Sequence, residues 1–135
     1  MVSQHVGKYE LVNPVSRLSY TYNLGEGNVL RCWGDLENVK GNYELARRYY
    51  VEAQSLLHSA KDRLGETYAL RGLGDLERAQ NHHDLAQQHY AEARGRFQAL
   101  GDKFGEAEVL CGIGDMESNQ GKYDLARQHY TEARR

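Results

Sequence analysis

Proline, cysteine and net charge are all scarce in this chain of 135 residues, which has one Pro, two Cys and a formal net charge of −2. Seventeen basic residues against nineteen acidic ones leave no basic excess for phosphate neutralisation, which argues against a dedicated nucleic-acid binder. Cys32 and Cys111 suit reduced thiols better than a secreted disulfide framework. No long apolar run suggests a signal peptide or a membrane span. We therefore expect one small cytoplasmic domain that does not act at a membrane.

Glycine, in contrast, is abundant, and an internal repeat accounts for it. A shift of 40 residues superimposes Leu24-Gly25-Glu26 on Leu64-Gly65-Glu66 and then on Phe104-Gly105-Glu106. The identical positions include Leu30, Gly34, Asp35, Glu37, Ala46, Tyr50 and Ala53, which recur 40 and 80 residues further on. We divide the chain into a leader or degenerate helix (1–23), two copies (24–63 and 64–103) and a truncated third copy (104–135), all in one domain. Self-similarity at such a period predicts a repeat array.

Each copy has two apolar patterns of helical period separated by a turn signal. The predicted buried stripe of the first helix is Val29, Leu30, Trp33 and Leu36 in copy one, Ala69, Leu70, Leu73 and Leu76 in copy two, and Val109, Leu110, Ile113 and Met116 in copy three. Gly41, Asn81 and Gly121 suit the left-handed residue that ends a helix. Asp62 and Asp102 can cap the following first helices. No segment alternates with period two, so we expect no sheet.

A glycine recurs inside each first helix, at positions 34, 74 and 114, although glycine costs roughly 1 kcal/mol there relative to alanine. We interpret it as a sign of close contact with the small residues of the second helix, such as Ala46 and Ala53. The bulky Tyr50 and its counterparts should then fill the space between neighbouring copies. Because one hairpin cannot bury its own stripe, the copies should stack.

At these residues the sequence resembles the tetratricopeptide repeat family. The pattern is carried by Leu70, Leu73-Gly74, His83, Ala86, Tyr90 and Ala93, and again by Leu110, Ile113-Gly114, Tyr123, Ala126, Tyr130 and Ala133. The resemblance covers residues 24–135, with a period of 40 in place of the family's usual 34. Such longer repeats look most like arrays in NB-ARC or NACHT signalling ATPases and in Pins/LGN-type adaptors. The resemblance implies an all-α solenoid, a right-handed superhelix of antiparallel helix pairs.

The polar side of the first helices is the predicted contact surface, because the resembled family binds a peptide or helix in the groove that these helices line. The candidate residues are Asn28, Arg31, Asp35, Asn38, Tyr68, Arg71, Asp75, Arg78, Glu108 and Asp115. The alternative is that Arg31–Asp35 and Arg71–Asp75 are ordinary surface pairs within one helix. Copy three has Cys111 where the other copies have Arg31 and Arg71, so its own helix offers no arginine to Glu108 and Asp115. We therefore predict that this end of the groove prefers a basic partner segment. Aspartate at positions 35, 75 and 115 argues against a clamp for a partner's terminal carboxylate.

No pattern predicts catalysis, a cofactor or a metal. Gly72-Leu73-Gly74 follows no strand and so is no nucleotide loop. His82 and His83 lie in a predicted turn, without the helical spacing of metal ligands. Glu37 and its counterparts recur in three copies, which favours a repeated structural hydrogen bond over a catalytic carboxylate.

We therefore predict a protein-interaction scaffold without enzymatic activity. The alternative is a self-association or autoinhibitory segment of a larger ATPase regulator, in which the uncapped end of the stack meets another subunit.

Overall fold

The computed structural model describes the backbone of residues 14–135 and the side chains of residues 22–135. This part of the chain contains six helices and no strand. The helices are α1 (Pro14–Lys40), α2 (Tyr43–Ser59), α3 (Arg63–Ala79), α4 (His83–Leu100), α5 (Lys103–Asn119) and α6 (Tyr123–Ala133). Among them, none is both long and apolar enough to cross a bilayer. The prediction of an all-helical fold is confirmed.

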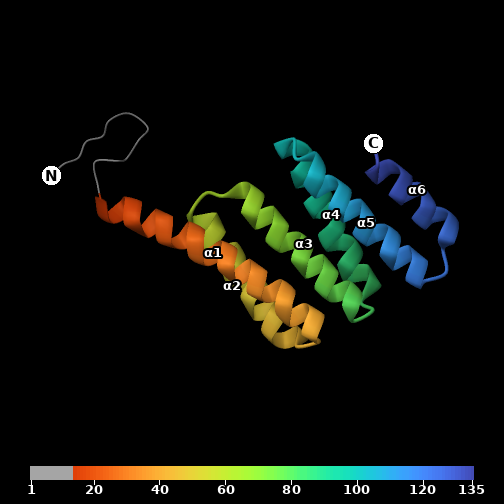
Figure 1. The fold of residues 1–135 in the computed structure, drawn as a ribbon, viewed down its shortest axis with the longest axis horizontal. Coiled ribbons are helices and arrows are strands. Elements are labelled where there is room, and N and C mark those ends of the chain that lie inside the picture. Colours follow the sequence, from red (N-terminus) through yellow and green to blue (C-terminus); the bar gives the residue numbers. More distant parts are fainter. Residues whose placement is uncertain (1–13) are drawn as a thin grey trace.

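Consecutive helices pack as antiparallel neighbours, and the array runs from α1 at one end to α6 at the other (Figure 1). The first helices of successive copies, α1, α3 and α5, also contact one another directly. The second helices, α2 and α4, each pack between the first helix of their own copy and that of the next. The molecule is therefore a tetratricopeptide-like α-solenoid, in which each copy is covered mainly by its neighbours.

The turns within the copies have the predicted left-handed residues. Gly41, Asn81 and Gly121 have φ values of 85°, 63° and 78°, a region that glycine and asparagine enter at low cost. The prediction that an aspartate caps the next helix holds for Asp62, whose side chain accepts a hydrogen bond from the Gly65 backbone amide at 2.9 Å. It is wrong for Asp102, which makes no such bond because its carboxylate accepts the Tyr68 hydroxyl instead.

The recurring glycines make room for tyrosine rings. A Cβ at Gly34 would lie 2.7 Å from the ring of Tyr50, and a Cβ at Gly72 would lie 2.4 Å from the same ring. Tyr50 is fully buried and thus fills the space between copies one and two, as predicted. Tyr90 lies in the same way between Gly74 and Gly112. The small residues of the second helix are also buried, but the atoms that require glycine belong to the tyrosine, which corrects the sequence interpretation.

Copy one departs from the predicted burial. The stripe residues of α3 and α5 are all buried, whereas in α1 only Leu30 is. Val29, Trp33 and Leu36 are about half exposed, because no second helix among the described residues packs on this side of α1.

The start of copy one also differs from the sequence interpretation, since α1 begins at Pro14 and runs without a break through the proposed boundary at residue 24. Proline is well suited to the first position of a helix. Residues 1–13, which include more than half of the proposed leader or degenerate helix, lie outside the described residues.

Candidate functional site

The candidate contact residues share one side of the solenoid, formed by α1, α3 and α5. We call this surface the first-helix face; it consists of Asn28, Arg31, Asp35, Asn38, Tyr68, Arg71, Asp75, Arg78, Glu108 and Asp115. The structure places all ten on adjacent first helices, and most are partly exposed. Their side chains are joined across the copies by contacts that the sequence analysis did not foresee.

Each aspartate of the first-helix face accepts a hydrogen bond from the tyrosine hydroxyl of its own copy. The Oη–Oδ1 distance is 2.5 Å in Tyr50–Asp35, in Tyr90–Asp75 and in Tyr130–Asp115. Burial, together with the neighbouring carboxylate, raises the pKa values of Tyr50 and Tyr90. These aspartates therefore fix the rings that fill the space beside the glycines, and repetition of the Gly34–Asp35 dipeptide was the sequence signal for that role.

Tyr68 is the aromatic centre of the first-helix face. The guanidinium carbons of Arg31 and Arg71 lie 5.6 and 5.7 Å from its ring centroid, within the range of cation–π attraction. Its hydroxyl donates to Asp102 at 2.7 Å, and its ring meets Phe97 edge-on at 4.8 Å. Burial and the hydrogen bond to Asp102 raise the pKa of Tyr68 to about 12. This residue thus links copies one and two.

The two acidic residues of copy three have arginine partners on α3. Arg71 donates to Glu108 through Nη1, and Arg78 Nη1 lies 3.6 Å from Asp115 Oδ2. Burial disfavours the charge of Arg71, but the nearby carboxylates outweigh that effect and raise its pKa. Glu108 and Asp115 are unpaired within their own helix, as predicted. The structure nevertheless gives each a cation from the neighbouring copy, so the premise for a basic partner segment is weaker than the sequence indicated.

Arg31 is the exception among the arginines of the first-helix face. The predicted pair with Asp35 does not form, and within the described residues Arg31 has no carboxylate partner. Its Nη2 donates instead to Asn28 Oδ1 at 3.3 Å. The Arg71–Asp75 pair, by contrast, is present at 3.6 Å. The α1 end of the face therefore has an uncompensated positive charge.

A buried ion pair joins copies one and two on the opposite side of α3. The side chain of Glu77, only 3% exposed, accepts from Arg47 Nη1 at 2.6 Å and meets His82 Nδ1 at 2.8 Å. Burial alone would raise the pKa of Glu77, but the two hydrogen bonds outweigh it and lower that pKa. The equivalent Glu117 bonds His129 at 2.7 Å. The predicted structural hydrogen bond is present, with different partners in different copies.

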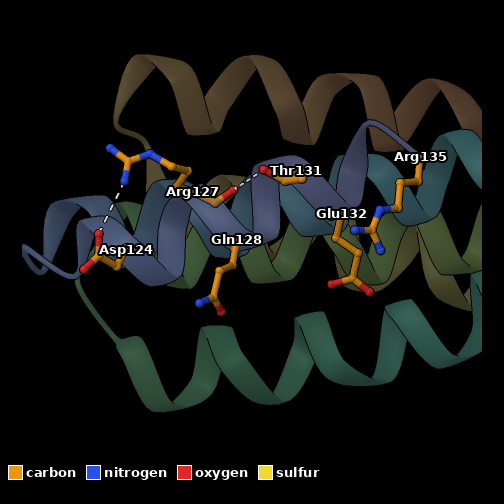
Figure 2. Close-up of a pocket in the computed structure, with 6 residues that line it drawn as sticks. All are labelled: Asp124, Arg127, Gln128, Thr131, Glu132 and Arg135. Carbon is orange, nitrogen blue, oxygen red and sulfur yellow. Dashed lines mark hydrogen bonds and ion pairs between the residues drawn. The ribbon is translucent and has the colours of Figure 1, made fainter.

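Elsewhere on the described part of the chain, the surface is hollowed only shallowly. An open depression of about 560 Å³ lies along α6, and its lining residues are polar (Figure 2). All six come from that one helix and its end: Asp124, Arg127, Gln128, Thr131, Glu132 and Arg135. Arg127 there lies 3.3 Å from Asp124. Among the described residues no group of three His, Cys, Asp or Glu side chains is arranged to hold a metal ion, and Cys32 and Cys111 are free thiols.

Comparison with known proteins agrees with the geometry. Searches among curated proteins and among solved structures found no match. A sequence profile described as the tetratricopeptide repeat matches residues 25–99, which is more than half of the chain. Those residues contain most of the first two helix pairs, the contacts of Gly34, Gly72 and Gly74 with tyrosine rings, and the left-handed turns at Gly41 and Asn81. The chain therefore belongs to the tetratricopeptide repeat family.

Proposed function

We propose that this protein is a non-catalytic interaction module that holds a partner peptide or helix on the first-helix face. Members of this family generally mediate protein–protein interactions. The observation that carries the proposal is the continuity of the face, because three first helices contact in series and present partly exposed polar and aromatic side chains. Two free thiols favour a reducing compartment, and we place the protein in the cytoplasm.

The charges of the face suggest how a partner would lie on it. Arg31 has no carboxylate partner among the described residues. The side chain of Asp115 is 50% exposed, and its 3.6 Å contact with Arg78 is longer than a hydrogen bond, so a basic partner group can still reach it. We propose that an extended segment places an acidic group near Arg31 on α1 and a basic group near Glu108 and Asp115 on α5. Rim charges of this kind affect the association rate and its salt dependence more than the total affinity.

Peptides selected from a random display library against the protein provide the test. We expect Arg31→Ala to weaken a selected peptide at least fivefold, and Glu108→Gln with Asp115→Asn to weaken it and reduce its salt dependence. Asparagine can still accept the Tyr130 hydroxyl, so the fold is retained. The matched control is Arg96→Ala, which removes an arginine that pairs with Glu92 on the exposed side of α4. Peptides that bind all of these variants equally would contradict the proposal.

A further inference from the structure

An apolar stripe runs along the outer side of α1, and no helix among the described residues covers it. We call it the α1 seam; it consists of Tyr22, Gly25, Val29, Cys32, Leu36 and Val39. All six residues are exposed. Trp33, which is 49% exposed, lies beside the seam, and its ring packs against Tyr49, with centroids 5.6 Å apart. An apolar stripe of this length on a soluble helix marks an interaction surface.

The same side of α3 and α5 shows what such a stripe normally meets. Val29 is 45% exposed, whereas its counterparts Ala69 and Val109 are fully buried under the second helix of the preceding copy. Leu36 is 54% exposed, and its counterpart Leu76 is fully buried. The four central residues of the seam thus occupy positions that are buried in the other two copies, whereas the positions of Tyr22 and Val39 are not.

A second helix of this array does not fit on the α1 seam. Gly72 and Gly112 lie against the tyrosine of the preceding copy, and a Cβ on either would approach that ring within 2.4 and 2.9 Å. Cys32 occupies the equivalent position in α1. Stacking α6 of another molecule here in the array's own geometry would force the Cys32 side chain into Tyr130. Head-to-tail stacking is therefore sterically disfavoured.

The spacing of the seam is instead that of a helix that pairs with another long helix. Its residues alternate steps of three and four, the heptad pattern of a two-stranded coiled coil, and in the sequence the alternation continues to Leu18 and Val15. The pattern from 15 to 39 reads the same in both directions, and its midpoint, residue 27, is also the midpoint of α1. Tyr22 and Val39 lie where the other copies have a cap residue or a polar or small residue, so the seam is longer than the footprint of a repeat neighbour.

We propose that α1 pairs with α1 of a second copy, antiparallel about a twofold axis beside residue 27. This register sets Gly25 opposite Val29 of the second copy and Tyr22 opposite its Cys32. Small residues then face larger ones, as close packing requires. A parallel pair would set Gly25 against itself and leave a gap. No atom of the structure lies within 4 Å of a Cβ at Gly25, so the approach is open.

The size of this interface predicts a weak dimer. A helix of 27 residues is about 40 Å long, and a contact strip about 10 Å wide buries roughly 400 Å² per copy. The total of roughly 800 Å² is below the roughly 1,200 Å² of stable specific complexes and lies in the range of weak, transient ones. We therefore expect a dimer that dissociates at concentrations on the order of tens of micromolar.

Sedimentation equilibrium of the 135-residue chain from about 5 to 300 μM tests the pairing. We expect a monomer–dimer equilibrium for the unmodified chain, and a dissociation constant at least tenfold higher for Val29→Glu combined with Leu36→Glu. The matched control is Val51→Glu, because Val51 on α2 is 52% exposed and lies outside the seam. Circular dichroism should report the same helix content for all three proteins.

Several outcomes would overturn this proposal. A strict monomer at 300 μM would mean that nothing in a second copy covers the seam, and masses above a dimer would indicate open stacking. An equal effect of Val51→Glu would remove the role of the seam. Orientation is tested with Val39→Cys in a Cys32→Ser, Cys111→Ser background. The antiparallel register separates the two new thiols by about 36 Å along the helix, so efficient disulfide cross-linking would refute it. These measurements use no peptide and are independent of the proposed binding on the first-helix face.

Discussion

Replacing Gly72 with alanine should destabilise the protein, although alanine is the better helix former. In an unobstructed helix interior, replacing glycine with alanine raises the free energy of unfolding by about 1 kcal/mol. At Gly72, however, the new Cβ would lie 2.4 Å from the Tyr50 ring. That ring is fully buried, has Gly34 on its other side and is tied by its hydroxyl to Asp35, so it cannot move aside. Overpacking of this kind costs up to about 3 kcal/mol, which leaves a net loss of about 2 kcal/mol.

Gly95→Ala provides the matched control with the opposite sign. Gly95 lies inside α4, is exposed, and has no atom within 4 Å of its Cβ position. Because only the helix propensity changes there, we expect the free energy of unfolding to rise by roughly 0.5 to 1 kcal/mol. Thermal unfolding followed by circular dichroism should show both effects, at about 4 °C per kcal/mol for a domain of this size.

The two substitutions together separate packing from propensity. We expect the melting temperature of Gly72→Ala to fall by about 8 °C and that of Gly95→Ala to rise by about 2 to 4 °C. Urea midpoints should rank the three proteins in the same order. If Gly72→Ala were as stable as the unmodified chain, the tyrosine between the copies would have room to shift. The recurring glycines would then need another explanation.

The remaining predictions concern the polar contacts between copies. Arg47→Met should lower the free energy of unfolding by about 1 to 3 kcal/mol in urea titrations, because it leaves the buried carboxylate of Glu77 without its closest donor. The control is Arg127→Met, at the same repeat position but exposed, which should change the free energy of unfolding by less than about 0.5 kcal/mol. The pKa of Tyr68 is raised to about 12 in the folded state, above its ordinary value near 10. The protonated hydroxyl therefore stabilises the fold fully below pH 10, and this contribution is lost as the pH rises from 10 towards 12. Tyr68→Phe should therefore lose less stability than the unmodified chain between pH 9.5 and 11, and an equal loss would count against the Tyr68–Asp102 bond.

The helices and turns could be predicted because the same residue types recur at the same positions in three copies. One turn with Gly41 is ambiguous, but Gly41, Asn81 and Gly121 at equal spacing identify a left-handed residue that recurs. The stripes of α3 and α5 were predicted correctly for the same reason, since each has a neighbour on both sides. Comparison of the three copies thus identified turn residues and buried stripes that one copy alone would not have identified.

The contacts of the first-helix face could not be predicted in the same way, because they join positions that differ between copies. Arg71 reaches Glu108, and Arg78 reaches Asp115, across neighbouring first helices. A helical wheel shows which residues share one side of a helix, but the pairing depends on how far α3 is offset along α5. That offset comes from the packing of tyrosine on glycine, which sequence periodicity does not measure.

The recurring glutamate shows how far identity between copies determines a role. Glu77 is clamped by Arg47 from the preceding copy and by His82, whereas Glu37, on α1, meets Asn42 at 2.7 Å and Lys40 at 3.7 Å. The residue is the same, but its partners differ, because the neighbouring helices present different side chains. Glu117 also follows a second helix, yet it bonds His129 of its own copy. In this array, the partners of a recurring residue therefore differ with the copy in which it lies, even where the residue itself is identical.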